Sequence, residues 1–213
     1  MFNEILKAFI ETCTMVFFSG LFAAMGGLPI GVILALTKKR QLLENKWLHG
    51  ILGAVVNATR SIPFIILMIA VMPLMRFFAG SSIQVKALIV PLTLAAMPFF
   101  ARTVEIALNE VPTGLIEAAK SMGATPYQIV YKVLLPEAMS GIVGGLTLTL
   151  VNLVGFSAMA GFNGSGGLGK LAIDYGLYRY NTEIILITVV IMIALVQLLQ
   201  SAGDYVQHKI FTH

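Results

Sequence analysis

Long apolar runs separated by short polar segments dominate the chain. Five runs stand out, at residues 12–36, 61–79, 86–108, 138–162 and 184–202. A helix needs about 20 mostly apolar residues to cross a bilayer, so each run is long enough for a span. Unbroken runs of this length favour helices over barrel strands, whose residues alternate in polarity. The pattern predicts an all-α integral membrane protein with five transmembrane helices.

Residues 44–60 fit this pattern less well. Residues 51–56 are apolar, but Asn57, Thr59 and Arg60 follow them directly. We predict an interfacial segment here, leading into the second span.

The segment from Thr37 to His49 is the most basic part of the chain. Loops rich in Lys and Arg stay in the cytoplasm, so this segment predicts the orientation of the spans. Five spans then place the N-terminus outside and the C-terminus inside. The basic residues assigned to the inside outnumber the others and are Lys38, Lys39, Arg40, Lys46, Arg60, Arg102, Lys120, Lys132 and Lys209.

Small residues recur at intervals of four in the apolar runs. Helices approach each other closely in membranes where such residues line one face. We expect tight helix packing at three such sets, which are Ala23 with Gly27 and Gly31, Gly141 with Gly145, and Ser157 with Gly161.

Composition excludes a water-soluble globule. Hydrophobic residues make up 58% of the chain, charged residues only 11%, and the mean hydropathy is +0.90. Soluble domains carry about 25% charged residues. The length suits a single membrane domain over residues 1–213. The net charge of +4 comes from scattered basic residues rather than a patch, so we expect no nucleic-acid partner.

Residues 111–136 carry the most informative local signals. Thr113 can cap a helix that continues to about Met122, and Gly123 suits the left-handed position that ends it. The segment follows the third span, so it is expected on the cytoplasmic face.

A second helix start follows at once. Thr125 is a good N-cap, Pro126 fits the first helical position, and Gln128 completes a capping box. Leu135–Pro136 is expected to turn the chain. The segment therefore predicts two short helices joined by a sharp turn, neither long enough to span a membrane.

The first of these helices has an apolar side. Ile116, Ala119 and Met122 share one face by their spacing, while Glu117 and Lys120 project elsewhere. Such a face could dock in a groove of a partner protein, or the helix could lie on the lipid headgroups. The residues alone leave both alternatives open.

The segment resembles the EAA loop of ABC importer permeases, which docks on the ATP-binding subunit. The matching positions are Glu117, Ala118, Ala119, Gly123, Ile129, Leu135 and Pro136. The resemblance implies a compact type I importer fold with five helices in each of two identical permeases. It also implies two ATP-binding subunits, an external binding protein and a location in a prokaryotic cytoplasmic (inner) membrane.

The same resemblance implies roles for individual residues. Glu117 would pair with a basic or polar group of the ATPase, Ala118 and Ala119 would permit close approach, and Gly123 would make the turn. ATP and magnesium would bind the partner subunit, so this chain would be a transporter permease without a cofactor and not an enzyme.

Other motifs are similar to those of methionine-uptake permeases in particular. They are the segments at residues 60–64, 90–93, 98–99, 123–126 and 165–169. The resemblance implies import of methionine, in its D or L form, with an extracytoplasmic methionine-binding protein. Another small amino acid such as cystine is the alternative substrate.

Two further features resemble a phosphate-binding loop and a set of metal ligands, and we expect neither site. Residues 164–171 nearly spell a phosphate-binding loop, but Leu171 replaces the required Ser or Thr, so a flexible gate or rim loop outside the membrane is expected. His49, His208 and His213 are too scattered for a metal site. We therefore expect that the energy for transport comes from a partner.

Polar residues inside the apolar runs suggest a passage. Thr147, Thr149, Asn152 and Ser157 lie in the fourth run, where they could line a pathway or bond to neighbouring helices. The candidate path residues are Asn152, Ser157 and Met159. In the third run, Arg102 and Glu105 are three residues apart and could form an ion pair.

Overall fold

The computed structural model describes residues 2–39 and 41–211, and every regular element in these ranges is a helix. Arg40, assigned to the inside above, and His213 lie outside the described residues. The helices are α1 (Phe2–Thr37), α2 (Lys46–Ser61), α3 (Phe64–Ala70), α4 (Met72–Ala79), α5 (Val85–Asn109), α6 (Thr113–Ser121), α7 (Pro126–Ile129), α8 (Leu135–Ala160), α9 (Gly167–Leu171) and α10 (Thr182–Phe211).

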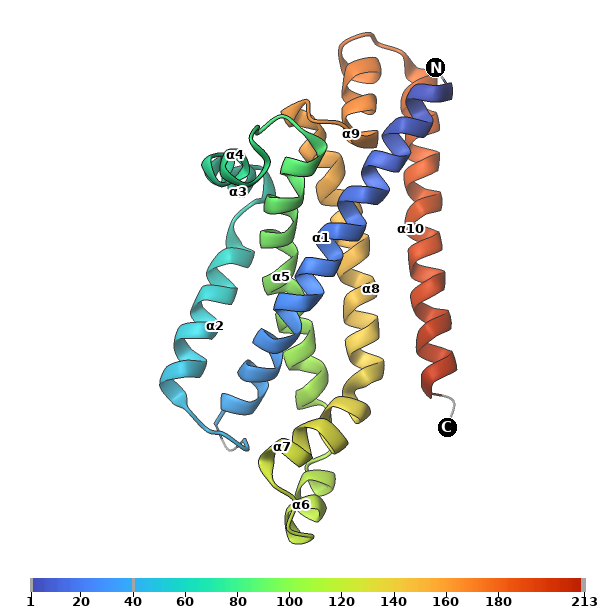
Figure 1. The fold of residues 1–213 in the computed structure, drawn as a ribbon. Helices are drawn as coiled ribbons and strands as arrows, with labels where there is room; N and C mark the ends of the chain where they lie inside the picture. Colours follow the sequence, from blue (N-terminus) through green and yellow to red (C-terminus); the bar gives the residue numbers. More distant parts are fainter. Residues whose placement is uncertain (1, 40, 212–213) are drawn as a thin grey trace.

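Long helices run side by side between the two ends of the molecule (Figure 1). Within the described residues, α1, α5, the helical stretch Pro126–Asn163 and α10 are each long and apolar enough to cross a membrane, and the bent pair α2 and α3 can supply a fifth span. We call the end that carries α6 and α7 the inner end, and the end that carries α9 and the N-terminus the outer end. The all-helical membrane fold is confirmed.

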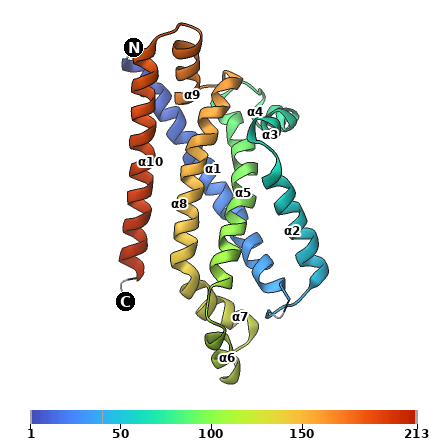
Figure 2. The same cartoon turned by 180° about the vertical axis from the view of Figure 1, so that it is seen from behind.

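The location of the second span was predicted wrongly. The run 61–79 is divided into α3 and α4, both short and both near the outer end, while α2 runs upright beside α5 (Figures 1 and 2). Segment 44–60 does not lie flat at the end of the bundle as an interfacial segment would, because α2 runs along α5. Helices α2 and α3 form the bent pair, with an angle of 105° between them.

Proline causes the bend between α2 and α3. Pro63 has no backbone N–H and disfavours a helical residue before it. Ile62 accordingly is extended, with φ −81° and ψ 123°, and α2 ends at Ser61. The apolar run continues across this point in sequence, but the helix does not.

Glycines on α1 allow close contact with α5. A Cβ atom on Gly27 would lie 2.8 Å from the Met97 carbonyl oxygen, and one on Gly31 would lie 2.6 Å from Cβ of Val104. Any larger side chain at these positions would force the two helices apart. The predicted packing role of this set is confirmed.

The other small-residue sets also lie at contacts. A Cβ atom on Gly141 would lie 2.8 Å from Cβ of Ala107, and one on Gly145 would lie 2.6 Å from Oγ1 of Thr103, so α8 packs closely on α5. Gly161, at the end of α8, packs against the backbone of Gly169.

Two buried apolar clusters fill the bundle at different depths. The outer cluster joins α1, α3, α5 and α8 and includes Met15, Phe64, Leu88 and Leu153. The inner cluster joins the inner ends of α1, α5 and α8 to α6 and α7 and includes Phe100, Val104, Ile116, Ile129 and Leu134. The second cluster therefore connects the segment 111–136 to the spans.

The glycine-rich segment at the outer end is bound to α1. The backbone N–H of Gly167 donates to the Glu11 carboxylate at 2.8 Å, and that of Leu168 donates to the Thr12 hydroxyl at 2.9 Å. A flexible loop was the wrong prediction for this part, because Gly167–Leu171 form helix α9 and Gly167, Leu168 and Gly169 are buried. The N–H groups that a phosphate loop would offer to a nucleotide are used here to hold α9 on α1.

Candidate coupling site

Helix α6 begins directly after a proline. Pro112 occupies the N-cap position with φ −57° and ψ 128°, and no side chain caps the helix. Thr113 is therefore the first helical residue and not the predicted cap. Proline fixes the extended backbone at this point, so the chain leaves α5 and enters α6 without a capping hydroxyl.

Gly123 ends α6 in the predicted left-handed conformation. Its φ is +79°, its N–H donates to the Lys120 carbonyl at 2.9 Å, and the N–H of Ala124 donates to the Ala119 carbonyl at 3.1 Å. This pair of bonds is the Schellman motif, which favours glycine because other residues are strained at positive φ. The sharp turn after α6 is confirmed.

The predicted capping box at the start of α7 is also present. The Thr125 hydroxyl accepts from the Gln128 N–H at 3.4 Å, and the Gln128 side chain accepts from the Thr125 N–H at 2.8 Å. Pro126 occupies the first turn, as expected.

The chain does not turn at Leu135–Pro136. One π-helical stretch, Val130–Leu134, joins α7 to α8, so the helical path runs continuously from Pro126 into the span. Pro136 is the second residue of α8, directly after the π-helical stretch. The prediction of a second separate short helix was therefore wrong, and α7 is the inner extension of a span.

The sequence-predicted coupling residues divide into two groups. Ala119 and Ile129 are buried in the inner cluster, and Leu135 packs against it. Glu117, Ala118, Gly123 and Pro136 are exposed. The carboxylate of Glu117 forms no ion pair with any described residue. The buried group anchors the segment, and the exposed group faces outward.

The expected apolar face of α6 is split in the same way. Ile116 and Ala119 pack into the inner cluster, whereas Met122 is 81% exposed. The face is therefore used mainly to attach α6 to its own chain, because the ends of α5 and α8 lie directly above it.

Two tyrosines that sequence reasoning missed extend the exposed surface. The rings of Tyr127 and Tyr131 stack with centroids 5.9 Å apart, and both are mostly exposed. Their spacing of four on a helix was the signal that could have revealed them. Leu115 and Met122 are also exposed at this end, and we call these four residues the inner-end surface.

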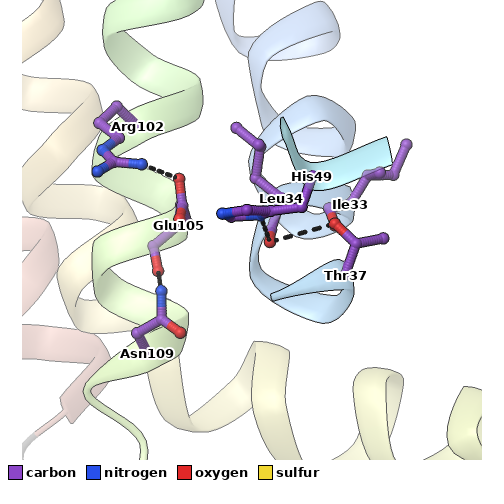
Figure 3. Close-up of polar contacts among 7 residues, drawn as sticks. All are labelled: Ile33, Leu34, Thr37, His49, Arg102, Glu105 and Asn109. Carbon is purple, nitrogen blue, oxygen red and sulfur yellow. Dashed lines mark hydrogen bonds and ion pairs between the residues drawn. The ribbon is translucent and has the colours of Figure 1, made fainter. Parts of the chain in front are cut away.

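A buried carboxylate lies just above this segment, on α5 (Figure 3). Nη1 of Arg102 donates to Oε2 of Glu105 at 2.6 Å, and the Asn109 amide donates to the Glu105 carbonyl at 2.7 Å. The side chain of Glu105 is only 4% exposed and that of Arg102 is 37% exposed. The predicted ion pair is confirmed.

His49 connects α2 to the inner end of α1 (Figure 3). Its Nδ1 lies 3.1 Å from the Leu34 carbonyl oxygen, which also accepts from the Thr37 hydroxyl at 3.4 Å. A carbonyl can only accept, so Nδ1 carries the proton. No group of three or more metal-ligating side chains occurs within the described ranges. The observed contact of His49 is the structural one with α1.

The candidate path residues lie on different sides of α8. Asn152 and Met159 are exposed and lie two turns apart on one face. Ser157 is 2% exposed, and its hydroxyl donates to the Val154 carbonyl of its own helix at 2.7 Å. The structure therefore brings Asn152 and Met159 together on an open face and places Ser157 inside the bundle.

Comparison with known proteins identifies relatives along nearly the whole chain. It is 53% identical to a probable D-methionine transport system permease protein MetI of Vibrio cholerae, over 97% of this chain and 92% of the relative. It is 44% identical to the corresponding protein of Haemophilus influenzae, over 99% of both chains.

Solved structures show the same fold. The chain matches a structure of the MetNI methionine ABC transporter in an inward-facing conformation with a TM-score of 0.96 and 48% identity, covering 99% of this chain and 97% of the other. An amino acid ABC transporter with histidines matches with a TM-score of 0.78 at 19% identity, over 97% of this chain and 94% of the other, which shows the likeness of fold alone.

The family match spans most of the sequence. Residues 27–212 match the family described as binding-protein-dependent transport system inner membrane component. The apolar helices agree with a multi-pass membrane protein. The chain therefore belongs to this family of transport-system membrane components.

Proposed function

We propose that this chain is the permease subunit of an ATP-driven importer of methionine. The observation that carries the proposal is the segment 111–136, which matches the EAA pattern and lies at the inner end with an exposed surface and a buried anchor. The relatives named as methionine permeases support the choice of substrate.

In the proposed assembly, residues 1–213 form a single membrane domain, and two copies pair in a prokaryotic cytoplasmic membrane. Two ATP-binding subunits hold ATP and magnesium and dock on the inner-end surface, with Glu117, Ala118 and Gly123 at the contact. Ala119, Ile129 and Leu135 anchor that surface to the chain, and Pro136 belongs to its exposed side. An extracytoplasmic methionine-binding protein delivers substrate to the outer end.

The packing favours a mechanism in which movement of α6 is transmitted to the spans. ATP binding draws the two ATPases together and moves both copies of α6. Because Ile116 and Ala119 share the inner cluster with Leu108 of α5 and Ala138 of α8, this movement passes directly to two spans. The spans then open toward the outside, and hydrolysis resets them. Asn152 and Met159 are the proposed path residues of α8, with Ser157 as their buried support.

Uptake of labelled methionine tests the proposal. The chain is reconstituted in vesicles with its ATPase and binding protein, and ATP is supplied or withheld on the ATPase side. We expect uptake only with ATP, and inhibition by excess unlabelled methionine.

Two results would contradict it. ATP-dependent uptake of cystine or another small amino acid but not methionine would replace the substrate. Uptake of methionine without ATP or ATPase would overturn the mechanism.

A further inference from the structure

Arg60 places a positive charge at mid-depth in the bundle. Its guanidinium carbon lies 5.8 Å from the centre of the Phe99 ring. Phe99 lies near the middle of α5, which runs from the outer end to the inner end (Figure 2). The assignment of Arg60 to the inner surface was therefore wrong, because α2 runs upright beside α5 from the inner end and Arg60 is in its last turn.

A cation at this depth needs water or a negative partner. Charged side chains that face hydrocarbon are strongly disfavoured, so they line water-filled cavities or pair with other charges. Arg60 is exposed on this protomer, and its guanidinium forms no ion pair with a described carboxylate. The guanidinium must therefore be solvated by water or paired with a negative group from outside this protomer.

Among the described residues, a second copy of the chain offers no free side-chain carboxylate at the same depth. Glu105 is the nearest in depth, but it is buried and bound to Arg102. The other acidic residues lie toward the ends, with Glu4, Glu11, Asp174 and Glu183 at the outer end and Glu44, Glu110, Glu117, Glu137 and Asp204 toward the inner end. Lipid headgroups are also confined to the two surfaces. Besides water, a mobile anion is the remaining partner.

The surroundings of Arg60 suit an amino acid with an apolar side chain. Phe64, the first residue of α3 after the bend that follows Arg60, stacks on Phe156 of α8 with ring centroids 5.0 Å apart. Asn152 lies one turn before Phe156 and is exposed. The helices α8, α5 and α2 lie side by side on the face seen in Figure 2. These three helices and α3 therefore carry a cation, an amide and aromatic rings, which contact thioethers favourably.

We propose that Arg60 binds the carboxylate of the amino acid substrate as it crosses the membrane. The guanidinium can donate two parallel hydrogen bonds to a carboxylate. The Asn152 amide is placed to bind the substrate's amino group, and Phe99 and Phe156 to contact its side chain. This inference rests on the proposed function, since it concerns the path of the same substrate.

A purely structural role makes a different prediction. A cation in the last turn of α2 is stabilised by the partial negative charge of the helix end. That role needs no ligand and gives no preference for a carboxylate.

Chemical protection separates the two roles. A cysteine is placed at the exposed Asn57, one turn before Arg60, in a Cys13→Ala background of the complex with its ATPase. The rate at which a small charged thiol reagent modifies it is measured with saturating methionine or with methioninol, which has an alcohol in place of the carboxylate. We expect methionine to lower the modification rate about tenfold more than methioninol does.

Replacement of Arg60 supplies the decisive comparison. Arg60→Gln should abolish the difference between the two compounds, Arg60→Lys should retain part of it, and Arg76→Gln, at an exposed arginine of α4, should leave it intact. Equal protection by both compounds, no protection, or a difference that survives Arg60→Gln would overturn the inference. Methionine uptake by the unmodified complex is measured separately, so failure of the proposed function is distinguished from failure at Arg60.

Discussion

Glu105 shows what one charge requires inside the bundle. It is 3% exposed, lies in a membrane-spanning helix, and has Arg102 one turn away as its partner. The arginine side chain is 37% exposed, so the pair connects a buried carboxylate to the edge of the bundle. Removing either member alone leaves a charge without compensation.

Loss of Arg102 should therefore destabilise the protein. We expect Arg102→Ala to lower the stability of the purified complex by about 1–3 kcal/mol, less than a fully buried pair because Arg102 is partly exposed. A thermal melting curve measures this change. The double variant Arg102→Ala with Glu105→Gln should recover most of the loss.

A second ion pair provides the control. Lys7 and Glu11 are 3.9 Å apart, and the Lys7 side chain is 77% exposed. Lys7→Ala should change stability by less than about 0.5 kcal/mol. An Arg102→Ala protein that melts like Lys7→Ala would show that the buried carboxylate is compensated in another way.

Individual side chains were predictable where the cause is local. The Arg102 and Glu105 pair follows from helical spacing, and so does the capping box at Thr125. The two sides of α8 were not predictable, because the sequence does not show that Asn152 is exposed and Ser157 is covered by neighbouring helices. That information is in the packing and not in the fourth apolar run.

At the scale of elements, the turn between α6 and α7 controls how the inner-end surface is presented. The turn depends on Gly123 at φ +79°, and a Cβ atom there would meet nothing within 4 Å. Any effect of substituting Gly123 must therefore come from its backbone conformation and not from a steric clash.

Replacing this glycine should weaken coupling more than folding. Gly123→Ala strains the left-handed residue by about 1 kcal/mol and should lower methionine uptake while the amount of permease in the membrane is unchanged. Gly114→Ala is the matched control, because Gly114 is in α6, has no close neighbours and needs no positive φ. A similar fall in uptake for both variants would mean that the conformation of the turn is unimportant.

The elements themselves were predicted unevenly. Apolar length identified α1, α5, α8 and α10, since these spans are continuous. It misplaced the second span because hydropathy continues through Pro63 whereas the helix cannot. It also missed the junction of α7 with α8, since a π-helical stretch at Val130–Leu134 carries the helix up to Pro136.

At the scale of the whole molecule, the exposed and buried sides of α6 have separate functions. The buried side is fixed to the spans by the inner cluster, and the exposed side carries Glu117 toward the proposed ATPase. A charge reversal on the exposed side should therefore affect the assembly and leave the fold of the permease alone.

This separation gives a prediction for Glu117. We expect Glu117→Lys to reduce both uptake and the stimulation of ATP hydrolysis by several-fold, because the carboxylate would lose its partner on the ATPase. Uptake and hydrolysis are measured on the same vesicles. Glu110→Lys makes the same charge change at an exposed site of the inner end outside α6 and should have a smaller effect. Unchanged hydrolysis in Glu117→Lys would remove this residue from the contact.

The glycine contact between α1 and α5 also bears on how the chain is made. Gly27 and Gly31 are synthesised well before Met97 and Val104, their partners across the interface. At ordinary rates of translation the gap is on the order of several seconds. During that time α1 can be in the membrane with its glycine face unpaired, so its final position is fixed only when α5 is inserted, and the nascent permease depends on this late step to bury its first helix.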